Sequence, residues 1–140
     1  MKNVDLSIVI VSYNTKKITQ DCLESINRSL TGAKIKYEVV VVDNNSHDGS
    51  QELLETMSQD SKNYLIYKQT DENLGFGRGN NLGVKMAQGQ YILLLNSDII
   101  ILNRAIEKLY NFYVAQEKPI HFLGAKLLNR DLTPQPSAGR

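Results

Sequence analysis

The chain has 140 residues, 41% of them hydrophobic and 22% charged, which is typical of a globular protein and excludes a disordered or fibrous one. Its 16 basic and 15 acidic residues give a net charge of +1 without a basic stripe, so nucleic acid is not an expected partner. The single cysteine, Cys22, excludes an internal disulfide, is expected to pack in the core and favours a cytoplasmic location. No apolar run approaches the about 20 residues that span a membrane.

Apolar runs rich in β-branched residues alternate along the chain with segments of helical periodicity. Strands are predicted at Leu6 to Val11, Glu38 to Val42, Leu65 to Lys68, Tyr91 to Leu95 and around His121 to Leu128. Four helices are predicted. In the first, Ile18, Cys22, Ile26 and Leu30 form one apolar face, and in the last, Ile106, Leu109, Tyr110 and Tyr113 form another. Between them, one helix is predicted to start near Ser50 and one to run from about Gly79 to Ala87. The alternation predicts an α/β fold, a three-layer α/β/α sandwich with a mostly parallel, Rossmann-like central sheet.

The same pattern predicts how the chain is divided. Residues 1–128 are expected to form one ligand-binding domain, and residues 129–140, which contain Pro134 and Pro136 but no periodic apolar residue, a loop-like tail. The first, second and fourth strands are apolar on consecutive positions, which predicts that both faces of the sheet are covered.

Three of the predicted strands end in polar clusters, and in open α/β sheets ligands bind beyond the carboxyl ends of the strands. The clusters are Ser12, Tyr13 and Asn14; Asp43, Asn44, Asn45 and Ser46; and Asn96, Ser97 and Asp98. Each cluster alone serves equally well to make a turn or to cap the next helix. Their recurrence at one edge of the sheet predicts a binding site there.

Two of these side chains suit a nucleobase. Tyr13 has a flat face on which a base can stack, and its alternative role is to close the end of the strand. Asp43 can accept a hydrogen bond from a base imide N–H, which uracil and thymine have and cytosine lacks; its alternative role is capping.

Asp98 emerges from a central strand and is a candidate ligand for Mg²⁺ or Mn²⁺, with Asn96 as a neutral oxygen ligand. The alternative role of Asp98 is to cap the helix predicted to begin near Asn103.

The segment from Asn73 to Asn81 is rich in glycine, but it does not have the spacing of a dinucleotide-binding motif. Its glycines read G-x-G-x-G and follow the third strand, whereas the fingerprint G-x-G-x-x-G follows the first. Glycines ahead of a helix N-terminus also let the backbone approach a sugar diphosphate.

Four motifs carry a family resemblance over essentially the whole chain. They are S-I-V-I-V-S-Y-N at Ser7 to Asn14, V-V-V-V-D-N-N-S-H-D-G-S at Val39 to Ser50, E-N-L-G-F-G-R-G-N-N-L-G at Glu72 to Gly83, and L-L-L-N-S-D at Leu93 to Asp98. In this order and spacing they resemble the family 2 glycosyltransferases, which have the GT-A fold. The resemblance implies a nucleotide-sugar-binding part of that fold, truncated before the acceptor-binding part.

The resemblance also implies roles for individual residues. Tyr13 stacks on the base, Asp43 binds it, Asn73, Gly75 and Asn81 line the ribose and sugar, and Asp98 binds the divalent metal. The usual D-x-D reads Asn96-Ser97-Asp98 here, as in the rhamnosyltransferase-like subgroup, which implies a dTDP-sugar or UDP-sugar donor and a weaker metal site. Arg78 and Asn80 depart from many relatives, which have a small residue at the first position and arginine at the second.

The family inverts the sugar during transfer to a saccharide or lipid-linked acceptor, with a carboxylate base located beyond residue 140 of this numbering. No catalytic residue is therefore expected within this chain, which should bind the donor only. The whole protein is expected in the cytoplasm, with attachment to the inner face of the membrane and homo-oligomers as open alternatives. Two other functions stay open. One is a nucleotide-binding module without transfer activity; the other is a nucleotidyltransferase, which the absence of glycine from Ser12 to Lys17 disfavours.

Overall fold

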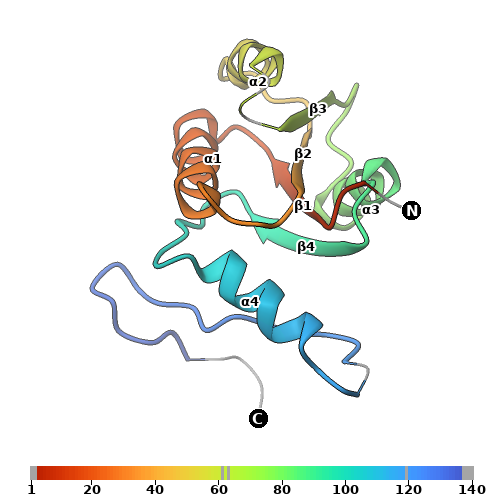
Figure 1. Cartoon of the computed structure of the whole chain (residues 1–140). Helices are drawn as coiled ribbons and strands as arrows, with labels where there is room; N and C mark the ends of the chain where they lie inside the picture. The colour runs from red at the N-terminus through yellow and green to blue at the C-terminus, as the bar shows by residue number, and fades with distance from the viewer. Residues whose placement is uncertain (1–2, 61, 63, 119, 137–140) are drawn as a thin grey trace.

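The computed structural model describes residues 3–60, 62, 64–118 and 120–136 (Figure 1). Strands and helices alternate along these residues as the sequence predicts. They are β1 (Leu6–Ser12), α1 (Lys16–Leu30), β2 (Tyr37–Asp43), α2 (Ser50–Gln59), β3 (Leu65–Gln69), α3 (Phe76–Met86), β4 (Tyr91–Asn96) and α4 (Ala105–Val114).

The four strands form one sheet in the order β3-β2-β1-β4, and every neighbouring pair is parallel. The predicted α/β fold with a parallel central sheet is confirmed. In the register of the sheet, Ser12 at the end of β1 lies opposite Asp43 of β2, and Val11 lies opposite Asn96 of β4. Because the strands are parallel, the three polar clusters emerge at the same edge of the sheet.

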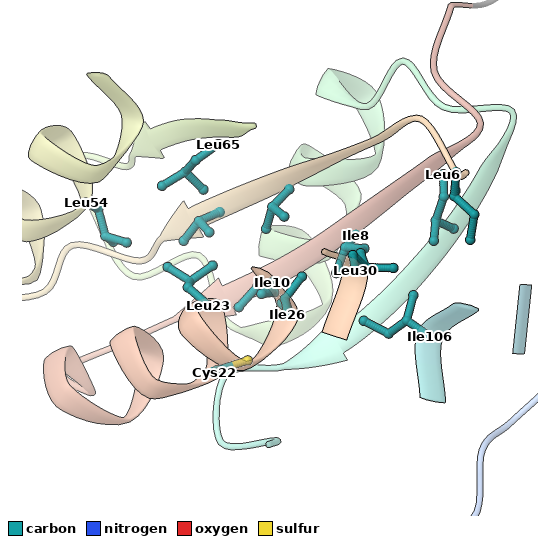
Figure 2. Packing of buried hydrophobic residues seen from close by; sticks show 13 residues of the cluster. Leu6, Ile8, Ile10, Cys22, Leu23, Ile26, Leu30, Leu54, Leu65 and Ile106 are labelled. Atoms are coloured by element: carbon teal, nitrogen blue, oxygen red, sulfur yellow. The ribbon is translucent and has the colours of Figure 1, made fainter. Parts of the chain in front are cut away.

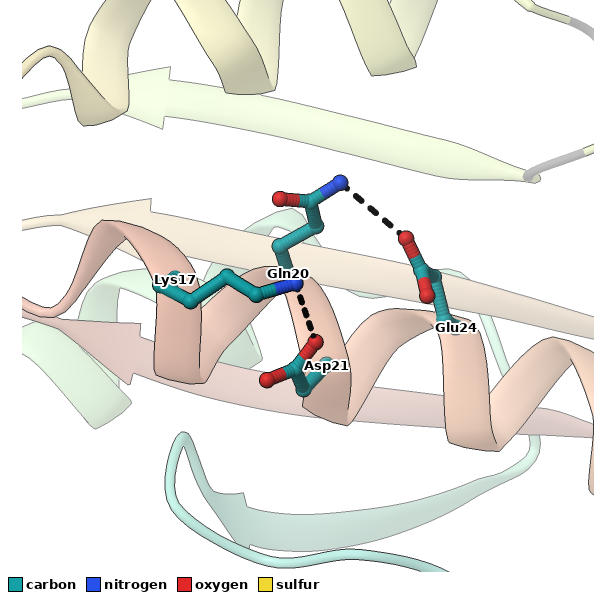
Figure 3. Close-up of polar contacts among 4 residues, drawn as sticks. All are labelled: Lys17, Gln20, Asp21 and Glu24. Carbon is teal, nitrogen blue, oxygen red and sulfur yellow. Dashed lines mark hydrogen bonds and ion pairs between the residues drawn. The ribbon is translucent and has the colours of Figure 1, made fainter.

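Strands β1 and β2 are buried on both faces, as their continuous apolar sequences predict. Ile8 and Val41 contribute to a core with α1, whose Cys22 and Ile26 have no exposed surface (Figure 2). The expected packing role of Cys22 is confirmed. The outer face of α1 carries polar pairs four residues apart: Lys17 Nζ lies 2.8 Å from Asp21 Oδ1, and Gln20 donates to Glu24 at 3.0 Å (Figure 3).

Helix α3 covers the opposite face of β1 and β2 and approaches it very closely. A Cβ added at Gly79 would lie 2.9 Å from Val11 Cγ1, and one added at Gly83 would lie 2.4 Å from Val9 Cγ1. Two glycines four residues apart on one helical face therefore let α3 rest directly on the valines of the sheet. The helix begins at Phe76, three residues earlier than predicted, because Gly75 adopts a left-handed conformation with φ 77° at the N-cap.

Strand β4 differs from the prediction that both sheet faces are covered. Tyr91, Leu93 and Leu95 pack towards the core, whereas Ile92 and Leu94 on the other face are 40% and 54% exposed. The reason is that α3 packs on β1 and β2 and leaves β4 bare on that side within the described residues. The exposed residues of β4 line an open apolar groove together with Val84 and Phe122.

The strand predicted around His121 to Leu128 is wrong. The segment forms no ladder, and its end contributes only an isolated antiparallel bridge between Leu128 and Pro134. A strand forms only with a partner, and the apolar residues of this segment remain largely uncovered, with Phe122 94% exposed. Among the residues with described positions, no helix combines the length and the apolar character needed to cross a membrane.

Candidate functional site

The carboxyl ends of β1 and β2 are joined into one framework. Asn44 N donates to Ser12 O at 2.8 Å, which continues the ladder beyond the two strands. In the following loops, Asn14 N donates to Ser46 Oγ at 2.8 Å, and His47 N donates to Asn14 Oδ1 at 2.8 Å. Asn14 and Asn45 have positive φ values of 50° and 65°, a conformation that asparagine tolerates better than most residues. The two loops therefore hold each other in place.

Asp43 lies at the centre of this framework with no exposed surface. Its Oδ1 accepts hydrogen bonds from Ser46 N, at 3.3 Å, and from Ser46 Oγ. Its Oδ2 has no partner among the described residues. Burial raises the pKa of the Asp43 carboxyl above its ordinary value, against the lowering effect of the Ser46 hydrogen bonds. One carboxylate oxygen is thus covered and has no hydrogen-bond donor among the described residues.

The other predicted residues at these strand ends divide into buried and exposed groups. Ser12 is fully buried, with its Oγ 3.1 Å from Thr19 Oγ1 of α1, so it shapes the site from within. Ser46 is buried beneath the loop, and Asn45 is half-buried. Tyr13 is 47% exposed and directly follows Ser12, which lies opposite Asp43 in the sheet.

Asn44 belongs to the predicted polar cluster after β2 but was given no individual role, and in the structure it connects β2 to the start of α3. It is 2% exposed, and its Nδ2 donates to Gly75 O at 3.3 Å. Its Oδ1 is buried without a partner among the described residues. The contact of Asn44 with α3 could have been predicted from the alternation of side chains along β2. Val40 and Val42 face α3, and Asn44 continues this series of every second residue.

The glycines of the segment from Asn73 to Asn81 have two different roles, since some border open space and another packs on the sheet. A Cβ at Gly75 or Gly77 would meet no atom within 4 Å, so these two residues border open space, whereas Gly79 packs on the sheet. Asn73 and Asn81 are exposed, and Asn73 Oδ1 accepts a hydrogen bond from Gly75 N at 2.8 Å. The same segment exposes Phe76 by 62%, a large side chain that the sequence prediction did not single out.

The third polar cluster follows β4 as a turn. Ile99 N donates to Asn96 O at 3.4 Å; Asn96 and Asp98 are exposed and Ser97 is half-buried. The alternative that Asp98 caps the next helix is wrong, because α4 begins at Ala105 with Arg104 at its N-cap.

The turn after β4, residues 96–98, contains one carboxylate, that of Asp98. The described residues contain no group of three or more histidine, cysteine, aspartate or glutamate side chains placed to hold a metal ion. Asp98 and the Asn96 amide nevertheless suit a hard cation that takes most of its oxygen ligands from a diphosphate and water. The donor set fits Mg²⁺ or Mn²⁺ in the presence of such a ligand.

Comparisons with known proteins identify the family of the chain. The model of glycosyl transferase family 2 matches residues 7–125. A poly(ribitol-phosphate) beta-glucosyltransferase from Bacillus spizizenii is 35% identical over 107 residues, which cover 76% of this chain and 17% of that protein. Glycosyltransferase GlyG from Streptococcus pneumoniae is 31% identical over 127 residues, which cover 90% of this chain and 40% of GlyG.

A solved structure shows the same fold. The crystal structure of Staphylococcus aureus TarS 1-349 in complex with UDP-GlcNAc superposes with a TM-score of 0.68 at 28% identity, over 79% of this chain and 31% of that one. The chain therefore belongs to the family 2 glycosyltransferases and has their GT-A fold. It spans less than half of the length of each of these relatives.

Proposed function

We propose that this chain is the donor-binding part of a glycosyltransferase that uses a uracil or thymine nucleoside diphosphate sugar. The observation that carries the proposal is the buried Asp43 carboxylate, whose Oδ1 is occupied by Ser46 and whose Oδ2 is unpaired. A buried acceptor without a donor is costly, and a base imide N–H relieves that cost. The complex of TarS with UDP-GlcNAc supports a uridine nucleotide for a relative of this chain.

We assign Tyr13 to cover the base and Asp43 to bind the edge of the base. Tyr13 directly follows Ser12, which lies opposite Asp43 in the sheet, and the hydrogen bond from Asn14 N to Ser46 Oγ connects the loops after the two strands. Because Oδ2 of Asp43 is covered in the free chain, we expect the Tyr13 side chain or the 44–46 loop to shift as the base enters. Asn73 and Gly75, which precede α3, and Asn81 within α3 are assigned to the ribose and sugar.

Asp98 would hold the divalent metal, with Asn96 and Ser97 beside it on the turn after β4. The cation would neutralise the leaving diphosphate during transfer. The chain's own contribution is one carboxylate at the end of a strand that lies next to β1, so the metal and base positions share one sheet edge.

The transfer itself is assigned to the complete protein. We propose inversion at the sugar carbon with a saccharide or lipid-linked acceptor, in a cytoplasmic enzyme, with the catalytic base outside residues 1–140. Asp131 is exposed and lies in the tail after α4. Residues 1–140 alone should bind the donor and transfer no sugar.

Calorimetric titration with UDP, dTDP and CDP in Mn²⁺ tests the proposal. The parent chain should bind UDP and dTDP and should discriminate against CDP. Asp43→Ala should lose about 1.5 to 3 kcal/mol of UDP binding, the range for a hydrogen bond to a charged group. Asp48→Ala is the matched control, since Asp48 lies in the same loop and binds Lys16 N and Ser50 N instead. Unchanged UDP affinity in Asp43→Ala, in a chain that remains folded, contradicts the assigned role.

A further inference from the structure

Arg78 lies in the first turn of α3, where its charge is unfavourable for the helix alone. The helix begins at Phe76, and its first turn holds no acidic residue. The unpaired N–H groups at a helix N-terminus carry partial positive charge, so a cation there is disfavoured and an anion is favoured. The N–H groups of Phe76, Gly77 and Arg78 meet no acceptor in the part of the chain that the structure describes.

The Arg78 side chain is fixed at this end of the helix. Its Nε donates to Leu74 O at 2.9 Å, which turns the guanidinium back towards the start of α3. Neither terminal nitrogen of the guanidinium has a partner among the described residues, and no described carboxylate forms an ion pair with it. Four N–H donors of Arg78 therefore remain available next to three backbone donors.

The first turn of α3 borders open space on one side and the polar side chain of Asn44 on another. Gly75 and Gly77 border open space, so a ligand can approach the backbone N–H groups closely. Beneath the turn lies the Asn44 amide, which is held to Gly75 O and has a buried, unpaired Oδ1. Several donors and one isolated acceptor match a phosphate group that has a hydroxyl close by, as in a sugar phosphate.

We propose that Arg78 and the first turn of α3 bind the diphosphate of the donor without metal, and that Asn44 Oδ1 accepts a hydrogen bond from a hydroxyl of the same ligand. The identity of the ligand rests on the proposed function. Because Asn44 Oδ1 is covered in the free chain, its pairing accompanies a shift of residues 73–75 on binding. Arg78 would thus add positive charge to a site at which the turn after β4 contributes the carboxylate of Asp98.

Calorimetry in the presence of a chelator separates this site from metal binding. Pyrophosphate, UDP and uridine are titrated into the parent chain, Arg78→Gln and Lys85→Gln. Lys85 is the matched control because it is exposed in the last turn of the same helix, and its replacement changes the net charge equally. We expect pyrophosphate and UDP to bind the Arg78→Gln chain about tenfold more weakly, as for a lost charge-assisted hydrogen bond, with uridine unchanged. All three ligands should bind Lys85→Gln like the parent.

A folding defect does not mimic this result. Without ligand, Arg78→Gln should unfold at the same or a higher temperature than the parent, since it removes a cation from the helix N-terminus. The proposal is overturned if the parent chain does not bind pyrophosphate in the presence of chelator. It is also overturned if Arg78→Gln and Lys85→Gln lose the same affinity for pyrophosphate and UDP. Loss of uridine binding in the parent, with pyrophosphate binding still dependent on Arg78, would contradict the base assignment of Asp43 and leave the Arg78 site standing.

Discussion

Strands β1 and β4 are neighbours in one sheet and both are apolar over consecutive residues, yet they have different surroundings. Strand β1 is covered by α1 on one face and by α3 on the other, whereas β4 has core packing on one face and exposed Ile92 and Leu94 on the other. Tyr13 and Asp43, which we propose bind the base, lie at the ends of the doubly covered strands β1 and β2, and Asp98, which we propose binds the metal, follows the half-covered strand β4. Under the proposed roles, the base would have a rigid position and the metal a more adaptable one.

The largest expected effect contrasts two apolar residues on these strands. Ile10→Ala should lower the free energy of unfolding by about 2 to 5 kcal/mol, because it leaves a cavity in a fully buried position of β1. Leu94→Ala on β4 removes a side chain that is 54% exposed and should cost well under about 2 kcal/mol. Urea denaturation of both variants measures the contrast. Equal losses would mean that the exposed face of β4 is covered in solution.

The close contact of α3 with the sheet gives the second prediction. Gly83→Ala should destabilise the chain by about 1 to 3 kcal/mol, since its Cβ would meet the stiff side chain of Val9 at 2.4 Å. Gly77→Ala in the same helix has open space around it and should stabilise the chain by about 0.5 to 1 kcal/mol. Opposite signs in thermal unfolding confirm the contact, whereas gains for both variants would show that α3 sits further from β1.

The metal position gives the third prediction. Asp98→Ala should weaken UDP binding by about tenfold, or about 1.4 kcal/mol, in Mn²⁺ and should leave binding in chelator unchanged. Asp43→Ala should weaken binding in both conditions, because its contact with the base needs no metal. Calorimetry with and without chelator distinguishes the two residues. If Asp98→Ala loses the same affinity in both conditions, Asp98 serves the turn after β4 rather than a cation.

The smallest expected effect is the pH dependence of Asp43. Burial raises its pKa in the folded chain, so the folded state binds the proton more tightly than the unfolded state does. Stability contributed by the protonated form is therefore present below the unfolded value of about 3.9 and is lost as pH rises through the folded pKa. Asp43→Asn should gain stability relative to the parent as pH increases from 3 to 7. If Asp43→Asn instead loses stability relative to the parent over this range, the Ser46 hydrogen bonds outweigh burial.

The sequence predicts the parts of the fold that depend on local periodicity. Continuous valine and isoleucine runs predict β1 and β2, and the polar residues after them predict the edge at which a ligand binds. It does not predict the bare face of β4, because an apolar strand looks the same whether or not a helix covers it. The Asn44 amide under α3 and the split between open and packed glycines were missed for the same reason, since both depend on how α3 lies across the sheet.

The reactivity of the buried Cys22 thiol can be used to measure local opening of the folded chain. Burial raises the pKa of this thiol to about 12, and its Sγ lies 3.8 Å from Asn96 O, where α1 meets the end of β4. A covered, protonated thiol does not react with a maleimide or a disulfide reagent. Labelling therefore requires α1 to lift away from the sheet, and its rate counts those openings. Because this is the chain's single cysteine, the count needs no engineered label and can be taken with and without a nucleotide.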